Sequence, residues 1–305
     1  MRELVLVGAG PVGLAAARAA VEEEAVSRVV AVVDPSEEAR RRGVALLGGL
    51  AHAFLEDLPP QLSVALVAFS SRSKLVAPSI EHLLLLGCHV VTTCEELAHP
   101  EEVERGRLQG LAEEASRSVV ATGANPGFVM DRLPLLLAGG SRRVRRVEVE
   151  RRLDTSLRRQ PLVAKTGRGL EVEEFRRRVT GGDIGHVGLE CSARLLADGL
   201  GWEVDDLTLS TDPYIEVGEQ VSGQHQRLEL RASGGRSIGL ELVMAWQLRE
   251  PLDRIRVDGE PPIEVLVQGG YHGDQGTTAR VVKGIQGIDG LAPGFYRPTD
   301  LPLWL

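Results

Sequence analysis

The chain has 305 residues, its apolar fraction is 43%, and its formal net charge at pH 7 is −8. A chain of this length and composition suits about two soluble globular domains. The negative charge and the lack of a basic tract argue against a nucleic-acid partner, and no apolar run reaches the roughly 20 residues that cross a membrane as a helix.

The first 34 residues show the pattern of a dinucleotide-binding unit. An apolar strand is predicted at 4–7, an Ala-rich helix at 14–24, and a second apolar strand at 29–33 that ends on Asp34. In such a unit the carboxylate at the end of the second strand accepts hydrogen bonds from a ribose hydroxyl. Asp34 favours NAD, because it would repel the 2′-phosphate of NADP. Three arginines at 40–42 leave NADP open, either as phosphate ligands or as a solvated helix face.

The turn between the first strand and the helix contains three glycines with separate roles. Gly8 allows a tight turn, Gly10 lets the backbone approach a pyrophosphate, and Gly13 lets the helix pack closely on the strand. The N-terminus of the helix adds unpaired N–H groups and a positive dipole end. The predicted pyrophosphate site consists of Gly8, Gly10, Pro11, Val12 and Gly13.

Strands and helices then alternate as far as residue 122, which is typical of a parallel sheet with right-handed crossovers. The predicted strands are 62–69, 89–92 and 118–122, and the predicted helices are 36–47, 75–86 and 101–117. Loops at the carboxyl ends of such strands line the ligand crevice. Small polar residues in these loops are therefore predicted to face the cofactor, although such residues are also common in loops without a function. They are Ser70, Ser71, Thr92, Thr93 and Asn125.

The segment Thr93-Cys94-Glu95-Glu96 follows a predicted strand at the expected mouth of the cofactor site. Thr93 and Glu96 have the spacing of a helix capping box. Glu95 is not needed for that cap, so its carboxylate is the candidate to hold an ammonium group or to transfer a proton. The alternative is a solvated acid that stabilises a helix start.

Beyond residue 137 the apolar pattern changes to the alternation of half-buried strands in a mixed or antiparallel sheet. Strands are predicted around 144–149, 207–210, 228–230, 240–248 and 263–267, with helices at 171–179, 188–200 and 277–287. We therefore predict an α/β protein with an N-terminal Rossmann domain, a doubly wound parallel sheet, and a C-terminal α+β mixed-sheet domain. The Rossmann domain comprises residues 1–127 and 276–305, and the substrate and oligomerisation domain comprises 128–275.

Two residues of the C-terminal domain are further catalytic candidates. Lys165 is one of three lysines in the chain, and lysine, unlike arginine, can release a proton near neutral pH. His186 lies between glycines before a predicted helix, where it either contacts substrate or packs at the helix start. Arg158 and Arg159 could clamp a substrate carboxylate. No histidine has partners at metal-binding spacing, so we expect no metal.

The three cysteines, Cys88, Cys94 and Cys191, fit neither a metal site nor a disulfide framework. The first apolar run lacks a preceding basic segment and leads directly into the glycine turn, so we interpret it as a core strand and not a signal peptide. These observations favour a cytoplasmic location.

Several segments, taken in order, resemble the 2,4-diaminopentanoate dehydrogenases and native amine dehydrogenases of the wider dihydrodipicolinate-reductase-like superfamily. The shared segments are the glycine turn, Thr-Thr-Cys-Glu-Glu at 92–96, Thr-Gly-Ala-Asn-Pro-Gly-Phe-Val-Met-Asp at 122–131, Lys-Thr-Gly-Arg-Gly-Leu at 165–170, Gly-His-Val-Gly-Leu at 185–189 and His-Gly-Asp at 272–274.

This resemblance implies NAD(P)-linked oxidation of a primary amine to an imine and then a ketone, or the reverse reaction. It also implies a C-terminal sheet that joins subunits into a homodimer or homotetramer. A glutamate near the nicotinamide is expected to hold the amine, and Glu95 matches that position, with Glu96 as the alternative.

Two departures leave the substrate open. The paired histidines expected of a dihydrodipicolinate reductase are absent, which argues against the alternative of a cyclic imine reductase. Cys191 stands where a Pro-Glu-Ser segment would place a glutamate. A third hypothesis, of another class, is an NAD(P)H-binding sensor without catalysis.

Overall fold

The computed structural model describes residues 2–156, 158–216, 218 and 220–302. The chain divides into two compact units, an N-terminal unit of Met1–Phe128 with Gly273–Leu305 and a C-terminal unit of Val129–His272. These boundaries differ from the expected ones by one residue (128 against 127) and by three residues (272 against 275).

Among the described residues, seven strands form the sheet of the N-terminal unit, in the order β13-β6-β5-β4-β1-β2-β3. All neighbouring pairs are parallel. The strands are β1 (Glu3–Val7), β2 (Arg28–Val33), β3 (Leu50–His52), β4 (Val64–Val67), β5 (His89–Thr92), β6 (Ser118–Ala121) and β13 (Gly294–Tyr296). The helices are α1 (Pro11–Glu22), α2 (Glu37–Leu47), α3 (Ser73–Leu85), α4 (Glu102–Glu114) and α9 (Gly273–Gly287), with short 3-10 helices η1 (Leu55–Asp57), η2 (Glu96–Ala98), η3 (Ile288–Gly290) and η4 (Pro298–Asp300).

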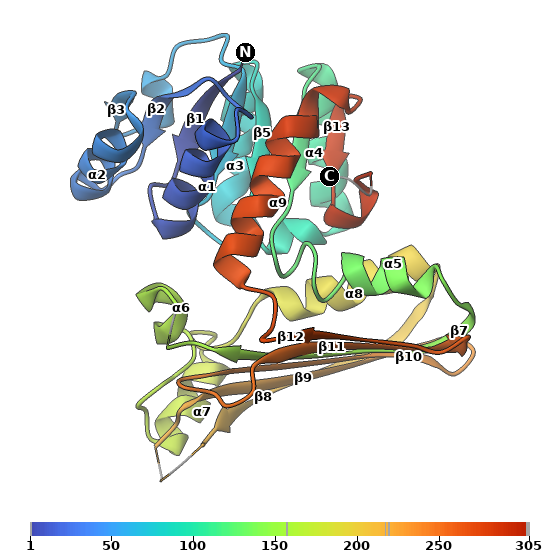
Figure 1. Cartoon of the computed structure of the whole chain (residues 1–305). Helices are drawn as coiled ribbons and strands as arrows, with labels where there is room; N and C mark the ends of the chain where they lie inside the picture. The colour runs from blue at the N-terminus through green and yellow to red at the C-terminus, as the bar shows by residue number, and fades with distance from the viewer. Residues whose placement is uncertain (1, 157, 217, 219, 303–305) are drawn as a thin grey trace. The chain divides into compact units, whose positions relative to one another are not determined.

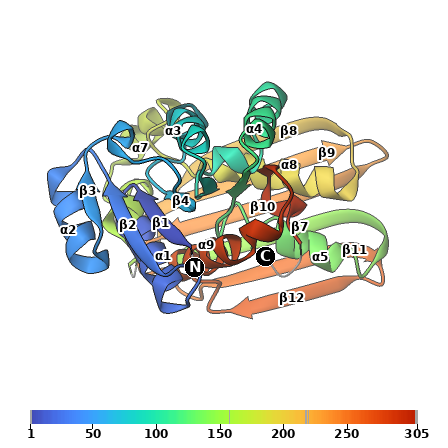
Figure 2. The same ribbon diagram turned by 90° about the horizontal axis from the view of Figure 1, so that it is seen from above.

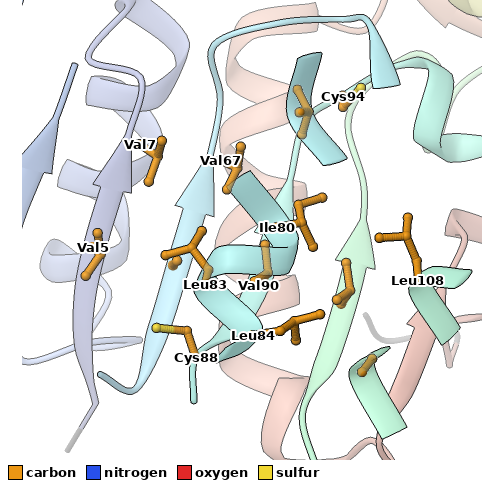
Figure 3. Packing of buried hydrophobic residues seen from close by; sticks show 14 of the residues in the cluster. Val5, Val7, Val67, Ile80, Leu83, Leu84, Cys88, Val90, Cys94 and Leu108 are labelled. Atoms are coloured by element: carbon orange, nitrogen blue, oxygen red, sulfur yellow. The ribbon is translucent and has the colours of Figure 1, made fainter. Parts of the chain in front are cut away.

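Both faces of this parallel sheet are buried, as its continuous apolar strands require. Leu4 and Leu6 of β1 point to the face that α1 and α9 cover, where they join one apolar cluster. Val5 and Val7 point to the face that α3 and α4 cover, where they join another (Figure 3). The view from above shows these helices on opposite sides of the sheet (Figure 2). The predicted Rossmann domain with a doubly wound sheet is therefore confirmed.

In the described part of the C-terminal unit, six strands form a mixed sheet in the order β12-β11-β7-β10-β9-β8. The β7–β10 pair is parallel and the other pairs are antiparallel. The strands are β7 (Arg142–Asp154), β8 (Val204–Tyr214), β9 (Gly223–Ala232), β10 (Arg236–Ala245), β11 (Leu252–Glu260) and β12 (Ile263–Gln268). The helices are α5 (Arg132–Ala138), α6 (Gln160–Ala164), α7 (Val172–Thr180) and α8 (Gly188–Leu200).

The two faces of this mixed sheet differ in character. Helices α5 and α8 lie over one face (Figure 1), which we call the covered face and which buries Val147, Val149 and Leu240. The opposite, open face carries charged side chains that pair across strands, such as Arg254 with Glu150. The predicted mixed-sheet α+β domain is thus confirmed, and its alternating sequence follows from one apolar and one polar face.

Some boundaries differ from the predicted ones. Helix α1 begins at Pro11 rather than at residue 14, because proline is favoured in the first turn, where its missing N–H is not needed. Strand β11 has no counterpart among the predicted strands, because only Ile255 and Val257 mark its buried face, which the polar Asp253 completes. None of the helices in the described ranges has the length and apolarity to cross a membrane.

Candidate functional site

The glycine turn between β1 and α1 leaves space at one position and none at the two others. Gly8 has φ +97°, and a Cβ there would lie 2.8 Å from Cβ of Phe69. A Cβ on Gly13 would lie 2.3 Å from the carbonyl oxygen of Gly8. A Cβ on Gly10 would meet no heavy atom within 4 Å. The turn is therefore closed where chain packs on chain and open at Gly10, which caps the N-terminus of α1.

The first turn of α1 can accept an anion at this open position. Pro11 has no N–H, and Gly10 has no side chain that could cap the helix. No capping side chain therefore accepts a hydrogen bond from the N–H groups of Val12 and Gly13. Such N–H groups with the helix dipole form an anion site. The residues present thus fit a pyrophosphate.

Asp34 fixes this turn to the end of β2. Its carboxylate accepts hydrogen bonds from the N–H of Ala9 (2.9 Å) and the N–H of Ser36 (2.9 Å). The Gly8 N–H donates to the carbonyl of Val33 at 2.9 Å. A carboxylate oxygen accepts more than one hydrogen bond, so Asp34 retains capacity for a ribose hydroxyl.

The three arginines after Asp34 are engaged with the protein itself. Arg40 donates to the carbonyls of Asp34 (2.6 Å) and Pro35 (3.0 Å). Arg41 pairs with Glu37, and Arg42 lies 3.9 Å from Glu38. This is the arrangement of a helix face with internal ion pairs.

The loop after β4 presents Ser70 and Ser71 beside an exposed aromatic ring. Phe69 is 45% exposed. The Ser70 hydroxyl accepts a hydrogen bond from the N–H of Arg72 (3.1 Å), and the Ser71 carbonyl accepts one from the N–H of Glu96 (3.2 Å). The loops after β4 and β5 are therefore joined.

The loop after β5 begins with two threonines in different settings. Thr92 is buried, and its hydroxyl donates to the carbonyl of Val67 (3.1 Å) and accepts from the N–H of Cys94 (3.2 Å). Thr93 is half-buried and donates its N–H to the same carbonyl at 3.2 Å. Burial raises the pKa of the Cys94 thiol to about 12, so it remains protonated.

The predicted capping box of Thr93 and Glu96 is wrong. The residue that caps η2 is Glu95, without a side-chain hydrogen bond. The Glu96 carboxylate instead accepts hydrogen bonds from the N–H of Ser73 and the guanidinium of Arg72, each at 2.7 Å. The Glu96 carboxylate thereby stabilises the start of α3, because it accepts hydrogen bonds from two residues at that helix end. Glu95 is half-buried at the start of η2.

The loop after β6 lies next to the loop after β5. The N–H of Thr122 donates to the carbonyl of Thr92 at 2.9 Å. Gly127 has φ +132°, and a Cβ there would lie 2.3 Å from the carbonyl oxygen of Gly123, so this segment folds tightly on itself. Asn125 lies in this turn, before a cis peptide bond to Pro126. The carboxyl ends of β1, β4, β5 and β6 thus bring the predicted cofactor residues to one edge of the sheet.

The candidates in the C-terminal unit lie on different elements. Lys165 is exposed and ends α6. His186 precedes α8. Its ring Nδ1 accepts a hydrogen bond from the N–H of Gly188 (3.0 Å), and its backbone N–H donates to Oε1 of Gln226 (3.0 Å). His186 is therefore fixed at the helix start.

Two buried groups of the C-terminal unit were not predicted. Arg151 and Asp253 form a fully buried ion pair, with Arg151 Nη1 at 2.9 Å from both carboxylate oxygens. The same two side chains bind the main chain of Tyr271. Arg151 donates to the Tyr271 carbonyl (2.7 Å), and the Tyr271 N–H donates to the Asp253 carboxylate (2.6 Å). Successive side chains of a strand point to opposite faces, so Arg151 lies on the same face of β7 as Val147 and Val149. This alternation is the signal in the sequence that places Arg151 on the covered face.

Comparison with known proteins agrees with these features. Residues 128–240 match the family of the 2,4-diaminopentanoate dehydrogenase C-terminal domain. The chain is 29% identical over 261 residues to 2,4-diaminopentanoate dehydrogenase of Acetoanaerobium sticklandii. The aligned region covers 79% of this chain and 74% of that protein.

Solved structures share the whole fold. The amine dehydrogenase from Mycobacterium smegmatis superposes with a TM-score of 0.83 at 18% identity, over 100% of this chain and 97% of that one. Biliverdin reductase from Synechocystis, in complex with biliverdin and NADP+, superposes with a TM-score of 0.61 at 14% identity, over 99% and 92% of the two chains. The resemblance predicted from the sequence is thus confirmed.

Proposed function

We propose that this protein is an NAD(P)-dependent oxidoreductase that converts a primary amine to an imine and then a ketone, in either direction. The observation that carries the proposal is the glycine turn, which is closed at Gly8 and Gly13, open at Gly10, and held beside the Asp34 carboxylate. The similarity to 2,4-diaminopentanoate dehydrogenase and to an amine dehydrogenase supports a carbon–nitrogen bond as the site of reaction.

The residues of the chain would bind and orient both reactants. The turn at Gly8, Gly10, Pro11, Val12 and Gly13 would hold the pyrophosphate. Asp34 would hold the adenosine ribose, and the loops with Ser70, Ser71, Thr92, Thr93 and Asn125 would line the nicotinamide side. A bound nicotinamide supplies the acceptor or donor of the hydride.

Glu95 is the proposed partner of the substrate amine. Its carboxylate would balance the charge of an ammonium group and accept the proton that leaves the nitrogen when the hydride leaves the carbon. Water then replaces ammonia at the carbon to give the ketone. Glu96 fits this role less well, because Ser73 and Arg72 already engage both of its oxygens. Lys165 and His186 are proposed as substrate contacts from the C-terminal unit.

NAD is the proposed cofactor in preference to NADP. Asp34 would lie at the ribose hydroxyls, where a 2′-phosphate would meet a negative charge. Arg40 is directed at two backbone carbonyls, and Arg41 and Arg42 lie beside glutamates. These contacts favour the interpretation that the three arginines form a solvated helix face rather than a site for the 2′-phosphate of NADP.

We also propose that the open face of the C-terminal sheet joins copies of the chain into a homodimer or homotetramer. This face holds a depression of about 540 Å³ among paired charges. Arg146 pairs with Glu229 (2.8 Å) and Arg254 with Glu150 (2.9 Å). Alternating charges of both signs allow the face to complement a second copy of itself.

The substitution Glu95→Gln tests the function. It is expected to lower amine turnover about 100-fold or more, because it removes the group that accepts the proton. NADH binding should be nearly unchanged, because the proposed pyrophosphate and ribose contacts lie on the loops after β1 and β2 and not on the loop that carries Glu95. Initial rates of NAD+ reduction with a panel of primary amines and a fluorescence titration with NADH measure the two effects.

Glu96→Gln is the matched control, with the same change one residue along the chain. It should keep most of the turnover, since its role is to bind Ser73 and Arg72. Full activity of Glu95→Gln, or loss of turnover in Glu96→Gln alone, would refute the assignment of Glu95. Absence of NADH and NADPH binding to the unmodified protein would refute the function as a whole.

A further inference from the structure

One large apolar side chain at the carboxyl edge of the parallel sheet is exposed instead of packing in the core. Phe69 follows the buried strand β4 and the half-buried Ala68, and it is 45% exposed. It belongs to neither of the two apolar clusters on the faces of this sheet. Single exposed apolar residues are common on protein surfaces, so the neighbours of Phe69 in the fold decide whether it has a ligand.

Phe69 lies against the glycine turn. A Cβ added to Gly8 would come within 2.8 Å of the Phe69 Cβ and 2.9 Å of the Phe69 backbone nitrogen. The Ala68 N–H donates to the carbonyl of Val7 at 2.8 Å, which fixes the start of the loop to the end of β1. Gly10, two residues after Gly8, has open space around it. The exposed ring therefore belongs to a residue that touches the turn proposed to hold the pyrophosphate.

The loop that carries Phe69 is also joined to the loop that carries Glu95. The Ser71 carbonyl accepts a hydrogen bond from the N–H of Glu96 at 3.2 Å, and the Val67 carbonyl accepts one from the N–H of Thr93 at 3.2 Å. In the sheet, β4 lies between β1 and β5. Phe69 thus occupies the part of the carboxyl edge between the glycine turn and the loop of Glu95.

The order of the strands gives a direction to a dinucleotide bound along this edge. The order β5-β4-β1-β2 corresponds, loop by loop, to Glu95, Phe69, the glycine turn and Asp34. The last two are the proposed sites of the pyrophosphate and the adenosine ribose. A cofactor whose reacting ring has to reach Glu95 would therefore pass Phe69 with its nicotinamide riboside. All of these residues belong to the N-terminal unit.

We propose that Phe69 is a cofactor-binding residue that packs against the nicotinamide riboside. An aromatic side chain offers a large apolar surface, on which another ring or the apolar side of a sugar can pack. This contact would remove from water the apolar surface that Phe69 exposes in the free protein. The inference rests on the proposed function and adds to it a contact with one half of the cofactor only.

The test compares two ligands that share the adenosine and the pyrophosphate. NADH also carries the nicotinamide riboside, and ADP does not. Phe69→Ala is expected to weaken NADH binding about tenfold, because the apolar contact with the ring is lost. Its affinity for ADP should stay within about twofold of the wild-type value. Fluorescence titration measures the Kd of NADH, and competition against bound NADH measures the Kd of ADP.

The emission of bound NADH provides a second readout, because the reduced nicotinamide ring is the fluorescent group. In Phe69→Ala the emission maximum of bound NADH should move toward that of free NADH, since water reaches the ring from which the phenyl group has been removed. Phe69→Leu keeps an apolar side chain and should show a smaller loss of NADH affinity than Phe69→Ala. Thermal unfolding without ligand shows that each variant is folded.

Phe54→Ala is the matched control, because Phe54 is also exposed (64%) and follows β3, the edge strand beyond β2. It should keep the wild-type ratio of the NADH and ADP affinities. Equal losses for NADH and ADP in Phe69→Ala would place its ring at the adenosine half, and an unchanged NADH affinity would exclude the contact. Either result would overturn this inference and leave the proposed function intact. A wild type that binds neither NADH nor NADPH would refute both.

Discussion

Chemically identical residues have different roles in this protein because their surroundings differ. The glycines of the turn are interchangeable by composition, yet Gly8 and Gly13 are enclosed by the chain and Gly10 is not. Glu95 and Glu96 are adjacent, yet Glu96 is bonded to the start of α3. The surroundings of each residue, and not its type alone, therefore decide its role.

The glycine turn gives a prediction at this scale. Gly10→Ala should leave the free energy of unfolding within about 0.5 kcal/mol of the wild type, because Gly10 has φ −74° and open space. It should weaken NADH binding about tenfold or more, because the methyl group occupies the space of the pyrophosphate. Denaturant unfolding and NADH fluorescence titration measure the two quantities.

Gly8→Ala is the comparison for that variant. Its φ of +97° and its contact with Phe69 should lower the free energy of unfolding by about 1–3 kcal/mol. If Gly10→Ala bound NADH as tightly as the wild type, the pyrophosphate would have to lie elsewhere.

At the scale of elements, β7 shows how a strand can carry many charges and still contribute to a core. Its alternation places Arg146, Glu148 and Glu150 on the open face and Val147 and Val149 on the covered face. Arg151 continues the covered face and meets Asp253 of β11 there. Burial raises the pKa of the Asp253 carboxyl and the Arg151 guanidinium opposes this effect.

The buried ion pair gives the prediction at the scale of elements. Asp253→Asn should lower the free energy of unfolding by about 3–5 kcal/mol, because it leaves the Arg151 charge buried without a counter-ion. Glu150→Gln, which breaks the partly exposed pair with Arg254, should lower it by less than about 1 kcal/mol. Denaturant unfolding measures both. Equal effects of the two substitutions would show that burial of the pair is not decisive.

At the scale of the molecule, the two units use their sheets differently. The N-terminal sheet is parallel and buried on both faces. A ligand therefore meets the loops at the carboxyl ends of its strands and not the faces of the sheet. The C-terminal sheet is mixed, and in the part of the chain that the structure describes α5 and α8 lie over one of its faces. Its open face is therefore available for association between copies.

The proposed association gives the prediction at this scale. Arg254→Glu places a negative charge beside Glu150 and Glu264 and should weaken self-association about tenfold or more, because like charges repel. Arg18→Glu, on the surface of α1, is the control and should not change it. Sedimentation velocity over a range of protein and salt concentrations measures the effect. An unchanged mass of Arg254→Glu, or a monomeric wild type, would contradict the proposal.

The sequence by itself determined the features that depend on residues close together in the chain. The glycine turn, the acid at the end of β2 and the alternation of strands and helices are local patterns. They predicted the fold class, which the structure confirms, and they are the basis of the proposed cofactor residues. The capping box of Thr93 and Glu96 was also a local pattern, and it failed because groups from another loop compete for Glu96.

Only the tertiary structure decided which polar residues are satisfied within the chain. Arg151 is balanced by Asp253, 102 residues away, and Gln226 is bonded to His186 and Thr211. Gln224 has the same chemistry as Gln226 and lies two residues from it, but none of the described residues forms a hydrogen bond with its side chain. Hydrogen bonds and burial depend on segments that meet only after folding, and a sequence pattern does not specify them.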